Sequence, residues 1–288
     1  MSGGAATPGG TATTGDTVSA ATTTPAPPRT ALAAPDPGRS MRALALREIR
    51  RVNRLWTQTI LAPVVSSALF ILVFGLSLGS RIKSIEGFEY DVFIVPGLIA
   101  MAMAQAAFSN NSSSLLQARN DRYINDVLAS PMHPWQMNLG YAVGGFFRSL
   151  AIGAALIAIA LPLTGTPIRN PAALALAVVL LVGLFSALGT VVGIYAQSFD
   201  HHSFINNILI LPLTFLGGVF YSIAILPSPW QEISHLNPIF YMVNAVRYGF
   251  LGTTDVSIAL SFAVTALIAA AMLAWSQWLF SSGHKLKP

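Results

Sequence analysis

Few residues of this chain could hold a metal ion or perform covalent chemistry, and their spacing is unfavourable. The strongest metal candidates are His201 and His202, which follow Asp200. Adjacent side chains on a helix point to different faces, and no second cluster completes a coordination shell. The sequence has no cysteine and no HExxH pattern, and no serine is set in the strand–turn–helix elbow of a hydrolase. We therefore interpret Asp200, His201 and His202 as polar residues at a helix end, and we find no enzyme signature.

The positions of the lysines also exclude an ATP-hydrolysing motor. Such a motor needs a phosphate-binding loop, usually GxxxxGK followed by Ser or Thr. The only lysines are Lys83, Lys285 and Lys287, and none of them closes a loop of this kind. We therefore expect no cofactor in this chain, and any energy from ATP must come from a separate polypeptide.

The most unusual polar residues form the run QAAFSNNSSS, from Gln105 to Ser114, inside an apolar stretch. Small hydroxyl and amide side chains in a membrane span either let helices approach closely or line a wet cavity. The consecutive pair Asn110 and Asn111 needs partners or water, which favours the cavity. A later apolar stretch has a matching polar start at Asn206 and Asn207, with Thr214 further along.

Long apolar segments must position these polar groups. Of the 288 residues, 53% are hydrophobic and 9% are charged, against roughly 25% charged in a typical soluble domain. The sequence predicts an all-α membrane protein with six transmembrane helices, each able to cross a hydrocarbon core about 30 Å thick. Their approximate ranges are Gln58–Leu78, Val92–Leu116, Leu139–Leu163, Ala172–Ala196, Phe204–Ile225 and Val256–Leu279.

Lys and Arg residues outside these spans are distributed unevenly. The N-terminal segment, the loop 116–138 and the C-terminal tail together hold eleven, whereas the alternate segments hold four. The positive-inside rule therefore places both termini in the cytoplasm. The net charge of +5 follows from residues beside apolar spans, so we expect contact with membrane lipids and no nucleic-acid partner.

The chain divides into three predicted parts. Residues 1–39 are rich in Gly, Ala, Thr, Ser and Pro, and they cannot bury enough apolar surface to offset the entropy of ordering. We expect them to form a disordered cytoplasmic tail. Residues 40–282 form the transmembrane domain, and residues 283–288 form a short basic cytoplasmic tail.

An amphipathic helix is predicted for Met41 to Trp56. Four arginines recur at i, i+3, i+4 and i+7, on one face of a helix, and apolar residues fall on the opposite face. This pattern is typical of a helix lying in the membrane interface, although positive-inside flanking charge alone would also explain it. The arginines are Arg47, Arg50, Arg51 and Arg54.

The loop after the second span, Gln117 to Asn138, contains a second short amphipathic helix. Charged residues alternate there with apolar ones, and Pro131 and Pro134 end the pattern. Such a helix is suited to a groove on another protein, and a solvated connector is the alternative. Its residues are Asp121, Arg122, Asp126, Val127 and Leu128.

The stretch Leu211 to Gly252 begins as an apolar helix, breaks at a glycine pair and passes through three prolines. Its aromatic residues are typical of the membrane–water boundary. We predict a re-entrant extracytoplasmic hairpin between spans five and six. The residues expected to form a gate there are Gly217, Gly218, Trp230, Asn237, Pro238 and Arg247.

Two blocks of this sequence resemble type-2 ABC transporter permeases. They are GGVFYSIAILPSPWQEISHLNPIFYMVNAVRYGFLG, residues 217–252, and GFEYDVFIVPGLIAM, residues 87–101. The similarity extends from about Met41 to Ser282, and it is greatest to bacterial inner-membrane permeases related to Nod-factor and drug exporters.

The resemblance implies a permease subunit in the cytoplasmic membrane. It would work with two copies of an ABC ATPase, which bind ATP and Mg, and with a second permease copy or a paralogue. The loop helix would be the coupling helix that transmits ATPase closure, and spans two and five would line the substrate path. The path residues expected on this basis are Asn110, Ser113, Asn207, Thr214 and Phe215.

The substrate implied by this resemblance is amphipathic or lipidic: a lipid, a lipid-linked glycan or a hydrophobic drug. Two other function classes remain open from the residues alone. An ion-coupled secondary transporter would need ionisable residues near the middle of the membrane, and only Arg148 lies within a predicted span. We expect Arg148 to reach the cytoplasmic interface or to pair with Asp126. A non-transporting membrane scaffold is the third possibility.

Overall fold

The computed structural model describes residues 36–79 and 84–286. Within these residues the chain is helical apart from turns and one isolated β-bridge between Ile85 and Phe88, so the all-α prediction is confirmed. The predicted tail up to residue 35 and the last two residues of the basic tail lie outside the described part. Residues 37–39 already belong to the first helix, because Asp36 caps it and Pro37 occupies its first position.

Among the described residues, five helical stretches are long and apolar enough to cross a membrane. They correspond to five of the six predicted spans. The first combines a π-helical segment, η1 (Thr57–Leu61), with α2 (Ala62–Gly79). The others are α3 (Tyr90–Asn120), α5 (Pro134–Thr164), α6 (Pro171–Tyr195) and α11 (Ile258–Ser282).

The letters GLSLG at residues 75–79 match the GxSxG pattern of hydrolases. They form the last turns of helix α2 and do not follow a strand. The match is therefore no nucleophile elbow.

Shorter helices connect or flank these spans. The N-terminal helix α1 covers Pro37–Arg54, and α4 (Ile124–Ala129) lies in the loop between α3 and α5. The rest are α7 (Phe199–Ile205), η2 (Asn206–Ile210), α8 (Leu211–Phe215), η3 (Ile223–Ile225), α9 (Ser228–Leu236) and α10 (Pro238–Leu251).

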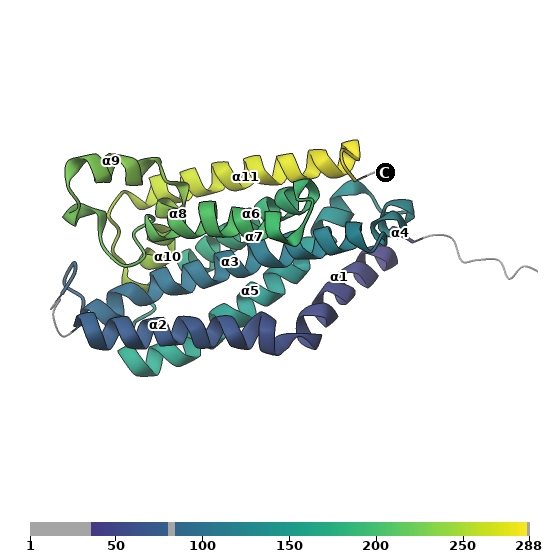
Figure 1. Cartoon of the computed structure of the whole chain (residues 1–288). Coiled ribbons are helices and arrows are strands. Elements are labelled where there is room, and N and C mark those ends of the chain that lie inside the picture. The colour runs from purple at the N-terminus through teal and green to yellow at the C-terminus, as the bar shows by residue number, and fades with distance from the viewer. Residues whose placement is uncertain (1–35, 80–83, 287–288) are drawn as a thin grey trace, which may run out of the picture. The chain divides into compact units, whose positions relative to one another are not determined.

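Helix α3 is the centre of the fold and packs against α2, α5, α6 and α10 (Figure 1). In the most apolar 18 residues of α3, 78% of the residues are buried. The same comparison gives 11% for the first span and 17% for α11. The close packing against α6 depends on glycine: a Cβ atom at Gly189 would lie 2.4 Å from the carbonyl oxygen of Phe108. The outer faces of α2 and α11 are left for lipid or another chain.

The predicted fifth span, Phe204 to Ile225, is not one continuous helix. The helical run consists of α7, η2 and α8, and it ends at Phe215, so the predicted end was ten residues too late. Pro212 lacks the N–H that would hold the preceding turn, and the π-helical segment η2 lies directly before it. Gly218 then takes a φ of +76°, which ends the apolar helix early.

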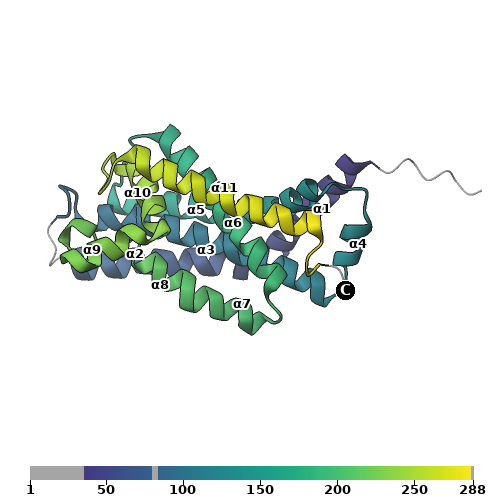
Figure 2. The same cartoon turned by 90° about the horizontal axis from the view of Figure 1, so that it is seen from above.

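The functional segments fall at the two ends of α3. Helix α9 lies toward the end of the molecule where α3 begins, whereas α4 and the start of α1 lie toward the end where α3 finishes (Figures 1 and 2). Most of α10 is buried against α3, α6 and α11, while α9 exposes Trp230 and Leu236. The structure thus has a helical pair where the sequence predicted a hairpin.

Candidate functional site

A cavity of about 540 Å³ lies between α2, α3 and the α7–η2–α8 run, with one residue from α5. Its volume is in the range of sites for small molecules. Apolar side chains form much of its wall: Phe70, Leu98, Met101, Leu211 and Phe215. The polar groups that reach it are Gln58, Ser66, Ser67, Gln105, Ser109, Arg148 and Asn206.

Helical spacing explains how α3 presents its share of this wall. Leu98, Ala102, Gln105 and Ser109 recur every three or four residues and so occupy one face. The Nε2 atom of Gln105 and the Oδ1 atom of Asn206 are buried, and neither has a hydrogen-bond partner among the described residues. Such atoms are rare in folded proteins because each one loses its solvation. The cavity therefore offers polar groups that a ligand or water can satisfy.

Both π-helical segments of the described chain border this cavity. Gln58 belongs to η1 and Asn206 to η2, and both side chains line the wall. In each case a proline follows closely, at Pro63 and Pro212. π-helical turns are costly and occur often at functional sites, because they redirect backbone groups and side chains. Their coincidence at one cavity marks it as a candidate site.

The predicted path residues are placed differently from one another. Phe215 lines the cavity, whereas Asn110 and Thr214 are fully buried, and Asn207 lies outside the lining and is exposed. The hydroxyl of Ser113 donates to the carbonyl of Ser109 at 2.6 Å, and Ser113 is not part of the lining either. The polar lining residues nearest in sequence are Ser109 and Asn206. Gln105 begins the polar run that the sequence already marked, whereas no sequence pattern pointed to Gln58, Ser66 or Ser67.

Arg148 forms no ion pair with Asp126 in the described part of the chain, so the second of its two expected placements is wrong. Its Nε atom donates to the backbone carbonyl of Thr59 at 2.8 Å. Pro63 has no N–H to give to this carbonyl, which lies four residues before it, so the arginine satisfies a backbone acceptor that the proline leaves open. Arg148 thereby fixes η1 against α5 and reaches the cavity.

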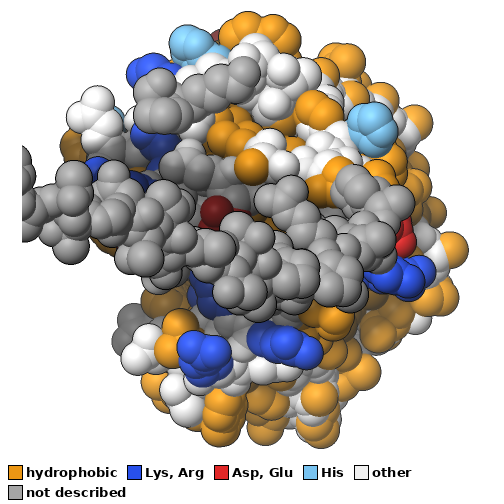
Figure 3. Space-filling model, turned by 90° about the vertical axis from the view of Figure 1, so that its right-hand side faces the viewer, with side chains coloured by type: hydrophobic (Ala, Val, Ile, Leu, Met, Phe, Trp, Pro, Cys, Tyr) orange, Lys and Arg blue, Asp and Glu red, His pale blue; other side chains and the backbone are white. Residues whose placement is uncertain are grey.

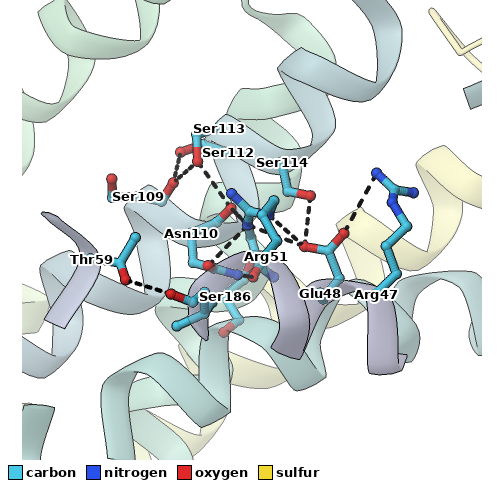
Figure 4. A network of polar contacts seen from close by, with 12 residues as sticks. Arg47, Glu48, Arg51, Thr59, Ser109, Asn110, Ser112, Ser113, Ser114 and Ser186 are labelled. Atoms are coloured by element: carbon cyan, nitrogen blue, oxygen red, sulfur yellow. Dashed lines mark hydrogen bonds and ion pairs between the residues drawn. The ribbon is translucent and has the colours of Figure 1, made fainter. Parts of the chain in front are cut away.

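Asn110 belongs instead to a buried network that holds α1 against α3 (Figure 4). Glu48 of α1 is fully buried and accepts a hydrogen bond from the Ser114 hydroxyl at 2.8 Å. Its second partner is Arg51, at 3.1 Å, which also donates to the side-chain oxygen of Asn110 at 2.9 Å. A Cβ atom at Gly144 of α5 would lie 2.8 Å from the Glu48 Cβ atom, so only glycine lets α1 approach this closely.

The four arginines of α1 were predicted to share one lipid-facing side, but they lie in different surroundings. Arg50 and Arg54 are exposed, but Arg51 turns inward to Glu48 and Asn110. The guanidinium of Arg47 lies 3.8 Å from the ring centroid of Tyr123, directly before α4. Glu48 lies between Leu44 and Val52 on the buried side of the helix, and a carboxylate at this position was the sequence signal that the helix has an internal partner.

Helix α4 directs its apolar side inward, which corrects the predicted contact. Ile124 and Val127 are buried in a core cluster with Leu115 and Met132, and Leu128 packs against it. The exposed residues are Asp121, Arg122, Asn125 and Asp126. Arg122 has a φ of 60°, so the helix begins only at Ile124 and not at the predicted Asp121. Any partner would therefore meet a polar surface here.

The same end of the molecule carries basic side chains (Figure 3). Arg119 donates to the carbonyls of Ile194 and Ala196 at 2.6 and 2.9 Å, and so it caps the end of α6. Cations are favourable at this terminus of a helix because its last carbonyls have no backbone partner. Partial burial raises the pKa of Tyr123, and its phenol donates to the Ser114 carbonyl at 3.3 Å.

At the opposite end, three of the predicted gate residues tie together the segments around α10. Arg247 is fully buried and donates to the carbonyl of Gly218 at 2.5 Å and to Asp255 at 3.4 Å. Asn237 caps α10 and donates to the carbonyl of Leu213 at 2.6 Å. The turn after α8 is thus tied to α10 and to the segment before α11.

The remaining gate predictions lie around this centre. Gly217 is buried, Pro238 begins α10 and Trp230 is 53% exposed on α9.

Partial burial and the neighbouring carboxylate of Asp255 raise the pKa of Glu86 above its ordinary value.

A cavity among membrane-spanning helices, together with a polar helix at one end and no nucleotide-binding loop, defines a membrane-embedded transport subunit rather than a motor. The sequence profile of the ABC-2 type transporter family matches residues 39–251. The chain therefore belongs to this family, whose permeases carry no cofactor and pair with a separate ATPase subunit.

Two named relatives support this assignment. The chain is 39% identical over 250 residues to the inner membrane transport permease YadH of Escherichia coli K12, covering 86% of this chain and 97% of that protein. It is 25% identical over 228 residues to nodulation protein J of Sinorhizobium fredii NGR234, covering 76% and 86%. The predicted family is confirmed.

Proposed function

We propose that this chain is the permease subunit of an ABC exporter in the cytoplasmic membrane, and that its substrate passes through the cavity between α2, α3 and α8. The observation that carries this proposal is the mixed lining, in which Phe70 and Phe215 face the same space as Gln105 and Asn206. An amphipathic or lipidic molecule needs both kinds of contact. The name of the Escherichia coli relative supports the inner membrane as location.

The remaining arrangement follows from this assignment. The α7–η2–α8 run serves as a broken fifth span, which brings the number of spans to six, and α9 and α10 form the re-entrant gate on the outer side. Both termini are cytoplasmic, as the distribution of Lys and Arg supports. Two permease copies, or one copy with a paralogue, join across the sparsely buried first span, and two ATPase copies dock beneath them.

The ATPase contact is assigned to the exposed side of α4. Asp121, Arg122 and Asp126 offer both signs of charge to a partner. The link from α4 to the spans runs through Tyr123, which contacts Arg47 and Ser114, and from there to Glu48. Movement of α4 would therefore reach α1 and α3 together.

A cavity-filling substitution tests the proposal. Ala102→Trp places an indole in the cavity, and Leu267→Trp adds the same ring on α11, where Leu267 is 72% exposed. In proteoliposomes of the permease–ATPase complex, Ala102→Trp should abolish ATP-driven transport while Leu267→Trp retains it. Equal transport by both variants, at equal protein levels, would refute this cavity as the route.

A further inference from the structure

Arg148 is the only charged residue among the sixteen that line the cavity. Its guanidinium uses one nitrogen, Nε, to hold the Thr59 carbonyl. Its two terminal nitrogens make no hydrogen bond to any residue in the described part of the chain, and no acidic side chain there forms an ion pair with it. The planar end of the group is therefore left for another partner.

The neighbouring charges do not compensate this cation. Glu48, the buried carboxylate of the α1 network, is already paired with Arg51 at 3.1 Å. The lining contains no Asp or Glu, and its apolar side chains lower the local polarity. A cation in such surroundings is costly without a counter-ion, and in membrane proteins it marks a ligand site by default.

The polar atoms around Arg148 suit an anion. The Gln105 Nε2 atom is a buried hydrogen-bond donor with no partner in residues 36–79 and 84–286. Hydroxyl groups of Ser66, Ser67 and Ser109 reach the same space. An arginine with its Nε already fixed presents a planar pair of donors, which matches two oxygens of a phosphate, sulfate or carboxylate.

We propose that the cavity binds an amphiphile with an anionic oxygen head group, held by the terminal nitrogens of Arg148 and by Gln105. Its apolar chain lies along Phe70, Met101 and Phe215. This inference rests on the proposed function, because it specifies the substrate class of the same cavity. The Pro63 break contributes directly, since it provides the open carbonyl that orients the arginine.

The test compares two ligands that differ only in the anionic group. The full chain is reconstituted in phosphatidylcholine nanodiscs, and binding of radiolabelled 1-oleoyl lysophosphatidic acid and 1-oleoylglycerol is measured. The native chain should bind the phosphate-bearing ligand at least about tenfold more tightly, because charge-assisted hydrogen bonds are worth that much. Competition by oleate and oleyl sulfate then identifies the preferred anion. Competition by inorganic phosphate tests whether the ligand needs its hydrocarbon chain.

Three variants assign the preference to this site. Arg148→Gln should reduce the ratio of the two affinities to about one, and Arg148→Lys should restore part of it. Arg169→Gln removes an exposed arginine in the loop between α5 and α6, outside the cavity lining, and should leave the ratio of the two affinities unchanged. If Arg148→Gln does not fold, Gln105→Glu is used, since it keeps the bond to Thr59 and should still abolish the preference by supplying an internal counter-ion.

The outcomes separate this inference from the proposed function. If Ala102→Trp abolishes binding of both ligands but Arg148→Gln and Gln105→Glu leave their ratio unchanged, the cavity stands and the anion site is refuted. If Ala102→Trp affects neither ligand, the cavity is not the binding site and both proposals fail. Competition by inorganic phosphate as strong as that by oleyl sulfate would refute an amphiphile as the ligand.

Discussion

Replacing Glu48 with Gln is expected to weaken the attachment of α1 to the spans. The carboxylate is fully buried, accepts from Ser114 at 2.8 Å and pairs with Arg51 at 3.1 Å. Removing one partner of a buried ion pair costs about 3–5 kcal/mol. The Arg51 side chain is still 20% exposed and can turn partly to water. We therefore expect the free energy of unfolding to fall by about 3 kcal/mol, the lower end of this range.

The assay is equilibrium unfolding of the purified full chain in mixed micelles, with hydrogen exchange of α1 read in parallel. The matched control is Arg50→Met, which removes an exposed charge from the same helix and should change stability by less than about 0.5 kcal/mol. The double variant Glu48→Gln with Arg51→Met should be destabilised by at least about 1 kcal/mol less than the sum of the single variants, because neither member of the close pair is then left buried without the other. Arg47, which lies 3.9 Å from Glu48, also loses this partner, but its side chain is 38% exposed and can be solvated.

Two results would refute this reasoning. One is a Glu48→Gln variant as stable as Arg50→Met, with unchanged exchange in α1. The other is strict additivity in the double variant, which would mean that the two side chains act independently despite their contact.

Two further predictions concern the ends of the molecule. Val127→Asp should lower the amount of folded protein, because Val127 is buried. Asp126→Arg changes an exposed residue, so it should leave folding intact and abolish co-purification of the ATPase. The reverse pattern would support the apolar docking face that the sequence predicted. Because the pKa of Glu86 is raised, its ionised form is disfavoured in the folded state. The resulting loss of folding stability is present above the raised pKa and disappears as the pH falls below it. Glu86→Gln should therefore raise the Tm at neutral pH but not at about pH 4, and an equal rise at both pH values would contradict this assignment.

The apolar spans could be predicted because hydrocarbon thickness sets their length and composition. The break at Phe215 could not be located from hydropathy, since the residues from Leu216 to Ile225 are as apolar as those before them. The glycine pair had indicated a break in the stretch from Leu211 to Gly252, and Pro212 just before it is a second signal. These residues determine backbone geometry, which an average over a window conceals.

The site residues were harder to predict for a related reason. A pattern of apolar residues shows that one side of a helix is covered, but it does not say by what. Val127 therefore looked equally suited to an ATPase groove and to the core that covers it. Gln105 and Ser109 share a helical face that the sequence already contains, whereas Arg148 and Asn206 join them only through packing of separate helices.

The central claim is that the cavity is a route opened and closed by the ATPase, and thiol labelling tests it directly. The chain contains no cysteine, so Ser66→Cys creates a single reactive site in the cavity wall and Leu267→Cys a single site facing outward on α11. The labelling rate of each variant with a water-soluble maleimide is measured in the permease–ATPase complex, with and without vanadate trapping. We predict that trapping changes the rate at residue 66 several-fold and leaves that at residue 267 unchanged. A rate at residue 66 that is negligible in both states, or identical in both, would contradict the claim.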